Sequence, residues 1–205
     1  MRGRTQELHV AAERSGVVAA LFRGQVSRSG YALYLRNLLP AYQAMEQALQ
    51  QFGNHTEFEE LAQPSIYRAA AIVSDLEALS GSDWTTSVPL LTSGQRYAAR
   101  VEWAGTGALL IAHCYTRYLG DLNGGQLLRQ HLVRRFGANF QALAFSRFPE
   151  IPDLTVFGAA YRQSLNRAGS RLSDVEGVIA EAVVAFDLNI AVSLEVDAFL
   201  RRSPA

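Results

Sequence analysis

Hydrophobic positions recur with helical spacing along almost the whole chain, and the alternation typical of strands is nearly absent. The clearest pattern spans residues 27–52 and stops at Gly53. Its apolar side chains follow one another within one helical turn: Leu33, Leu35, Leu38, Leu39, Tyr42, Met45 and Leu49. We therefore predict an all-α fold.

The same spacing predicts shorter and longer helices elsewhere. They lie at residues 5–13 with Thr5 as cap, 65–79 ended by Ser80 and Gly81, 95–136, 154–167, and 173–202 with Ser173 as cap. Residues 82–95 are rich in Ser, Thr, Pro and Gly and predict a loop, and residues 136–152 predict an aromatic, proline-containing connector. Gly105 and Gly107 predict a break within 95–136.

Length and composition favour one globular domain covering residues 1–205. The chain has 205 residues, of which 49% are hydrophobic and 19% charged, an ordinary globular composition. Its single cysteine, Cys114, cannot form an internal disulfide, so we expect a reducing, cytoplasmic setting. The start lacks the apolar core of a signal peptide, and no run reaches about 18 apolar residues. We expect no membrane anchor.

The formal net charge of +0 disfavours a nucleic-acid binder, which would concentrate positive charge. All 19 basic residues are arginine. Residues 129–171 hold seven arginines and two acids, whereas residues 172–200 hold six acids and no base. This segregation indicates either a docking face for a charged partner or solvated helix faces that differ in sign.

Three glycines interrupt the apolar pattern of residues 95–136: Gly120, Gly124 and Gly125. A glycine inside a helix costs about 0.5–1 kcal/mol relative to alanine, so three of them require a reason. One interpretation is a helix end. The other is a kinked helix whose bare backbone lies against a ligand, and it is favoured by a polar stripe at i, i+4 and i+8: His113, Arg117 and Asp121.

The segment YTRYLGDLNGGQ, residues 115–126, together with the preceding Ala112 and His113, resembles the distal-helix signature of heme oxygenases. Similarity extends through ELHVAAE, FRGQVSRSGY, LLPAYQAMEQAL, LAFSRFP, FGAAYRQSLN and AFDLNI, covering essentially residues 5–200. The resemblance implies a single-domain helical bundle. In it, heme is sandwiched between a proximal N-terminal helix and a kinked, glycine-rich distal helix.

The resemblance also implies an activity. Heme serves as substrate and cofactor, and it is cleaved to biliverdin, carbon monoxide and ferrous iron with O2 and an external electron donor, a ferredoxin or a reductase. Two other functions remain open: a non-catalytic heme-binding or heme-storage protein, and a helical scaffold for another flat ligand. Asp121 beside the glycines favours the enzyme, because binding alone does not require a distal carboxylate.

His9 falls on the family's axial-ligand position, which makes it the expected iron ligand. Glu13, four residues later, can accept a hydrogen bond from the other ring nitrogen and fix the tautomer. The alternative ligands are His55, His113 and His131, of which His113 is the main rival because it lies on the polar stripe.

The resemblance assigns the distal side to a water network that Asp121 organises. Arg117, Tyr42 and Asn189 match positions of that network, and Gly120 and Gly124 leave space against the heme. A simpler interpretation also stands: Arg117 and Asp121 form only an intrahelical ion pair, and the other two are core polar groups with satisfied hydrogen bonds.

The heme carboxylates require cations or hydrogen-bond donors at the cavity mouth. Tyr115 and Arg162 match positions that contact them, and Arg2 falls where the family often has a lysine. Phe186 and Gly125 match the heme pocket. The chain departs from the family in having no lysine, and in having Gly158 where a basic residue is frequent.

Overall fold

The computed structural model describes residues 1–53, 55, 58–105 and 107–202, and within these ranges it contains helices and no strand. The all-α prediction is confirmed. The long helices are α1 (Arg2–Glu13), α3 (Arg28–Phe52), α4 (Ala69–Ser80), α6 (Thr92–Ala104), α7 (Leu110–Phe136), α8 (Leu154–Ser170) and α9 (Val175–Arg202). The short ones are α2 (Gly16–Phe22), α5 (Trp84–Ser87) and the 3₁₀ turn η1 (Pro64–Ile66).

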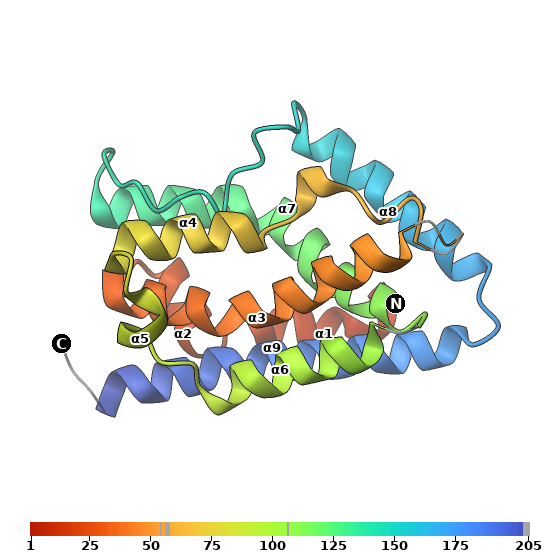
Figure 1. Ribbon diagram of the computed structural model, residues 1–205, viewed down its shortest axis with the longest axis horizontal. Helices are drawn as coiled ribbons and strands as arrows, with labels where there is room; N and C mark the ends of the chain where they lie inside the picture. Colours follow the sequence, from red (N-terminus) through yellow and green to blue (C-terminus); the bar gives the residue numbers. More distant parts are fainter. Residues whose placement is uncertain (54, 56–57, 106, 203–205) are drawn as a thin grey trace.

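Helix α3 forms the centre of the bundle, as its apolar pattern predicts. Ser27 caps it by accepting a hydrogen bond from the Gly30 amide. Its apolar side chains, among them Tyr31, Leu35 and Leu38, are completely buried. Helices α4, α6 and α9 pack around it, and Figure 1 shows α3, α6 and α9 running along the long axis of the molecule.

Helix α9 is long and apolar enough to cross a membrane, judged by length and composition alone. In the folded chain it packs against α1, α2, α3, α6 and α7, and part of its surface, including Leu194, stays exposed. The buried apolar positions of α9 therefore serve packing with five helices of the same chain.

Helix α7 runs without interruption from Leu110 to Phe136, so the interpretation of its glycines as a helix end is wrong. The break predicted at Gly105 and Gly107 is confirmed, because α6 ends before it and α7 begins after it. Figure 1 shows the green and teal halves of α7 running in different directions. The helix thus bends in the region that carries the glycines.

Three helix starts differ from the prediction. Helix α1 begins at Arg2, so Thr5 lies inside it and does not cap it; its hydroxyl donates to the Met1 carbonyl instead. Asp174 rather than Ser173 directly precedes α9, and its carboxylate accepts from the Gly177 amide. The predicted helix at 65–79 begins as η1, and α4 starts only at Ala69.

Two short elements lie where none was predicted. Helix α2 follows α1 directly, and α5 together with the first turn of α6 occupies the predicted loop at 82–95. The connector between α7 and α8, by contrast, lacks regular secondary structure, as predicted.

Candidate functional site

A cavity of about 410 Å³ opens between α1 and the N-terminal half of α7. Residues of α8 and α9 complete its walls. Its lining includes Thr5, Gln6 and His9 from α1, Tyr115, Thr116, Leu119 and Gly120 from α7, Arg162 and Asn166 from α8, and Phe186 from α9. A smaller cavity of about 140 Å³ adjoins it and shares His9, Thr116, Gly120 and Phe186 with it. The two form one site between the predicted proximal and distal helices.

His9 faces both cavities from α1. Its side chain is 54% exposed, and its Nδ1 lies 3.5 Å from Glu13 Oε1, as the i,i+4 spacing predicts. The ring is tilted against Phe186 with the centroids 6.1 Å apart. Because Nδ1 faces Glu13, Nε2 is the nitrogen left for a ligand.

His113, the main rival, is turned away from the site. It is completely buried and its Nε2 lies 2.9 Å from Glu181 Oε1 of α9. Burial acts to raise the pKa of Glu181, but hydrogen bonds from His113 and Arg100 outweigh it and hold that pKa at about 2. His113 therefore serves a buried ion-pair network between helices.

The two remaining histidines also lie outside both cavities. His131 packs edge-on against Phe22, with the ring centroids 5.8 Å apart. His55 packs against Phe52 at the end of α3. Of the four histidines, His9 alone lines the site.

The glycines of α7 leave open space along one face of the helix. A Cβ atom built at Gly120 or Gly124 meets no heavy atom within 4 Å, and both residues line the smaller cavity. Gly125 lines that cavity too, but its Cβ would approach the Ser146 carbonyl of the connector at 3.6 Å. Gly120 and Gly124 thus open the site, whereas a side chain at position 125 would only make ordinary van der Waals contact with the connector.

Three predicted polar residues, Arg117, Asp121 and Asn189, line the smaller cavity, and Tyr42 is hydrogen-bonded to two of them. Tyr42 donates a hydrogen bond of 2.5 Å to Asp121 Oδ2 and accepts one of 2.9 Å from Arg117 Nε. The guanidinium of Arg117 also lies 3.2 Å from Asp121 Oδ1 and donates to Asn189 Oδ1 at 2.7 Å. These contacts join α3, α7 and α9, so the cluster is more than an intrahelical ion pair.

Burial dominates the electrostatics of this cluster. It raises the pKa of Asp121, while the charge of Arg117 and the hydrogen bond from Tyr42 act in the opposite direction. Burial likewise raises the pKa of Tyr42 well above its ordinary value, which keeps the phenol protonated. The site therefore offers a neutral donor, a fixed cation and a carboxylate whose proton affinity is increased.

The mouth of the larger cavity carries two of the predicted carboxylate-binding residues. Tyr115 lines it, and its hydroxyl lies 3.2 Å from the Thr5 hydroxyl of α1. Arg162 is exposed and lines the same cavity from α8. The side chain of Arg2 lies outside the described part of the structure. Gly158 is not among the lining residues.

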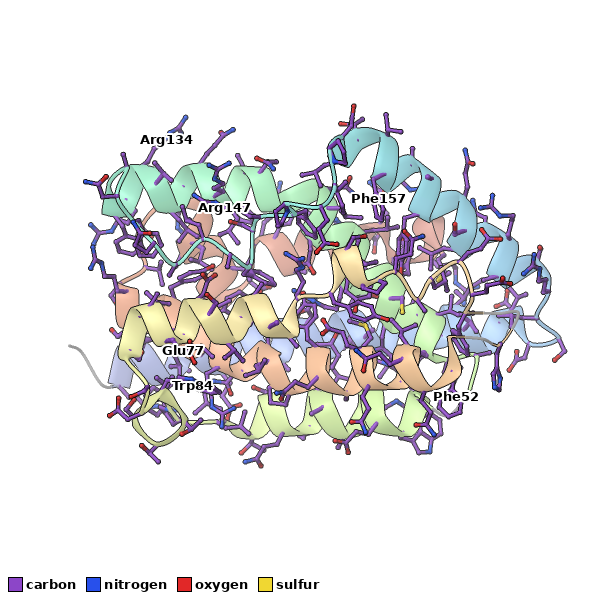
Figure 2. The ribbon with its side chains drawn as sticks, turned by 45° about the horizontal axis from the view of Figure 1, so that its top comes forward. Phe52, Glu77, Trp84, Arg134, Arg147 and Phe157 are labelled. Carbon is purple, nitrogen blue, oxygen red and sulfur yellow. The ribbon has the colours of Figure 1, made fainter. Side chains whose placement is uncertain are left out.

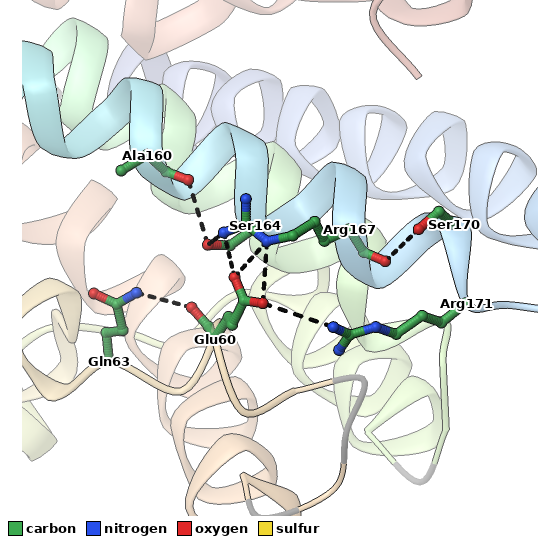
Figure 3. A network of polar contacts seen from close by, with 7 residues as sticks. All are labelled: Glu60, Gln63, Ala160, Ser164, Arg167, Ser170 and Arg171. Carbon is green, nitrogen blue, oxygen red and sulfur yellow. Dashed lines mark hydrogen bonds and ion pairs between the residues drawn. The ribbon is translucent and has the colours of Figure 1, made fainter.

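A polar network fixes the helix that carries Arg162. Figure 3 shows Glu60, which follows α3, between Arg167 and Arg171 of α8. Arg167 also donates to the Ser164 hydroxyl at 3.1 Å, and Gln63 donates to the Glu60 carbonyl at 2.8 Å. The single carboxylate of Glu60 thus pairs with two of the seven arginines in residues 129–171.

The sequence prediction missed several lining residues of the smaller cavity, among them Tyr34, Thr116, Phe145 and Ser146. Thr116 precedes Gly120 and Gly124 by four and eight residues, so the glycine stripe itself indicated it. Tyr34 lies two helical turns before Tyr42 on α3, a weaker signal. No local pattern indicated that the connector would supply Phe145 and Ser146.

Comparison with known proteins agrees with this geometry. The heme oxygenase family model matches residues 1–195. Heme oxygenase 1 of Synechocystis sp. is 33% identical over 199 residues, covering 96% of this chain and 83% of the relative. Heme oxygenase 1 of Rattus norvegicus is 35% identical over 201 residues, covering 96% and 70%.

Solved structures give the same result. The crystal structure of the Synechocystis heme oxygenase-1 in complex with heme aligns with a TM-score of 0.91 and 32% identity, covering 98% of this chain and 92% of that one. The heme oxygenase of Leptospira interrogans aligns with a TM-score of 0.88 and 30% identity, covering 95% and 97%. The chain belongs to the heme oxygenase family.

Proposed function

We propose that this heme-degrading oxidoreductase binds heme in the joined cavities with His9 as axial ligand, and that Asp121 organises the water which delivers protons to the reaction. The observation that carries the proposal is the arrangement across one cavity: a histidine with its Nδ1 facing Glu13 on α1, and the bare backbone at Gly120 and Gly124 on α7. A flat ligand fits between such walls because no side chain projects from the glycines.

The residues present suit the chemistry of heme. When bound, heme would supply the iron that activates O2 and the porphyrin that is cleaved to biliverdin, carbon monoxide and ferrous iron. His9 would hold the iron through Nε2, and Phe186 would pack beside it. Tyr115 and Arg162 at the mouth would receive the carboxylates, for which a guanidinium and a phenol are suitable partners.

The cluster around Asp121 would handle protons. Tyr42 and Arg117 donate to its two oxygens and fix the carboxylate in the wall of the smaller cavity. Because burial raises its pKa, this carboxylate can hold a proton more readily than an exposed one and pass it to cavity water. Asn189 fixes the guanidinium, so it acts through Arg117.

The test is aerobic incubation of the heme complex with ascorbate. We expect the Soret band to give way to biliverdin absorption, which a protein that only stores heme would not produce. An Asp121→Ala variant should still bind heme but lose at least about tenfold in the rate of biliverdin formation, in line with the removal of a proton-transfer group. Normal biliverdin formation by this variant would contradict the role of Asp121.

A further inference from the structure

A deeply buried arginine holds the connector between α7 and α8. Arg68 is 4% exposed, and its guanidinium donates to the carbonyls of Ala144, Phe145 and Arg147 on the connector. It also donates to the Ile66 carbonyl at 3.0 Å, and it lies 4.0 Å from the centre of the Phe148 ring. Within the described ranges no carboxylate forms an ion pair with it. Its hydrogen-bond partners are peptide carbonyls.

A buried carboxylate holds the same segment from the other side. Asp75 of α4 is 1% exposed and accepts hydrogen bonds from the Ala144 amide at 2.8 Å and from the Phe145 amide at 2.9 Å. Arg68 and Asp75 together thus bind the backbone N–H and C=O groups of two successive residues, Ala144 and Phe145. Figure 2 shows the connector, with Arg147 labelled, passing between α7 and α4.

Two charged groups buried in this way are expensive. An isolated buried charge costs several kcal/mol, and an apolar replacement is often neutral or stabilising. Burial raises the pKa of Asp75 to about 6 although two amides donate to it, which indicates that desolvation is not fully compensated. A connector that only had to join two helices would not need such groups.

The segment they hold forms a wall of the site. Phe145 and Ser146 line the smaller cavity, opposite the glycine stripe of α7. Ser146 is itself fixed, because its hydroxyl donates to the Leu143 carbonyl at 3.0 Å. The Phe145 ring meets the Tyr42 ring edge-on, with the centroids 5.9 Å apart. The clamped segment therefore touches the polar cluster directly.

We propose that Arg68 and Asp75 are positioning residues which clamp residues 144–147 and thereby determine which meso edge of the bound heme is presented to the reacting side. The inference rests on the proposed function of the cavity. A wall that shifts by a fraction of an ångström changes the rotation at which a flat ring can enter, because packed walls are not continuously deformable. Neither residue touches the heme cavity itself.

The test compares Asp75→Asn with Glu77→Gln. Both substitutions remove one negative charge from α4, but Glu77 is exposed and labelled at the surface in Figure 2. In Asp75→Asn, one carboxylate oxygen becomes an NH2 group, which cannot accept a hydrogen bond. The backbone N–H of either Ala144 or Phe145 then loses its acceptor. In the ligand-free protein, we expect Ala144 and Phe145 to exchange their amide hydrogens about tenfold faster in Asp75→Asn than in wild type or Glu77→Gln.

With heme bound, the ratio of biliverdin isomers should change in Asp75→Asn and stay unchanged in Glu77→Gln. Arg68→Lys provides a second variant, since a compact ammonium cannot reach the same set of carbonyls. Unchanged amide exchange would contradict the proposal that Asp75 holds the connector. Faster exchange with an unchanged isomer ratio would contradict the proposal that the connector determines the orientation of heme. If the wild type made no biliverdin, the proposed function would fail, and the exchange measurement would show separately whether the connector is clamped.

Discussion

Two histidines of this chain show how the environment of a residue decides its use. His9 lies half exposed on α1 beside Glu13, whereas His113 is buried against Glu181. Both occupy helices that flank the site; the family resemblance favoured His9, and the polar stripe made His113 its main rival. The difference arises because α9 places a carboxylate beside His113 and an aromatic ring, Phe186, beside His9.

Replacement of His9 by alanine should remove the axial ligand without disturbing the fold, because the side chain makes no buried hydrogen bond. We expect heme added to His9→Ala to lack the absorption spectrum of the wild-type complex, and free imidazole to restore it by entering the space left behind. His131→Ala serves as the control and should keep the wild-type spectrum. An unchanged spectrum in His9→Ala would assign the iron to another residue.

At the scale of elements, helix α7 combines two requirements that oppose each other. Its interior glycines weaken the helix, because glycine loses more backbone freedom on folding than alanine does. The same glycines leave the space that the cavities occupy. The glycines therefore lower the stability of α7 because the site needs the space, and close packing does not require them.

Gly120→Ala and Gly124→Ala should separate these two effects. Each should raise the free energy of unfolding of the ligand-free protein by about 0.5–1 kcal/mol, since the added methyl group meets no atom within 4 Å. Each should also weaken heme binding, because the methyl group projects into the cavity. Urea denaturation and heme titration measure the two effects.

Gly169→Ala in α8 is the matched control for these variants. A Cβ atom there also meets nothing within 4 Å, and Gly169 lines neither cavity. It should stabilise the protein to a similar extent and leave heme affinity unchanged. Equal heme affinities in all three variants would contradict the position of heme against the glycines.

Local patterns predicted the long helices, but they failed where contacts with residues distant in the sequence determine whether a helix forms or where it begins. Helix α3 carries its own periodicity and its own cap, so it was predicted almost to the residue. Helix α2 was missed because it is seven residues long and depends on Gly16, where a Cβ atom would lie 2.2 Å from the Ser193 carbonyl oxygen. The start of α4 depends on Glu46, whose carboxylate accepts from the Arg68 and Ala69 amides.

The residues of the site likewise fall into those that a local pattern predicted and those that it did not. The motif on α7 indicated Arg117, Gly120 and Asp121, because they follow one another along one helix. The connector residues Phe145 and Ser146 could not be predicted, since Asp75 and Arg68, about 70 residues earlier, hold them in place. Sequence patterns thus predict which side chains one helix contributes to the site. Tertiary hydrogen bonds determine which residues lie opposite that helix.

At the scale of the whole molecule, the separated charge along the sequence remains a prediction about a partner. Part of it is neutralised within the fold, because Glu60 pairs with Arg167 and Arg171. Arg134 and Arg135 near the end of α7 are exposed, and Figure 2 shows Arg134 pointing outward. An acidic electron donor would be attracted to such a surface.

Turnover driven by a ferredoxin-type donor should therefore fall as the salt concentration rises, since charges are screened over about 10 Å at 0.1 M. The double substitution Arg134→Glu and Arg135→Glu should slow donor-driven turnover several-fold at low salt, and ascorbate-driven turnover should not change. Arg96→Glu on α6, which lines neither cavity, is the charge-reversal control. A flat salt profile would favour solvated helix faces without a partner.

The pairing of α1 with α9 has a consequence for how the protein is made. His9 leaves the ribosome well before Phe186 and α9, the helix against which α1 packs. A nascent chain that has reached Ser170 carries the histidine, the glycines and Asp121, yet it lacks the surface that places α1 opposite α7. Translation must therefore pass α9 before heme can be captured, and chains that stall earlier should leave it free in solution.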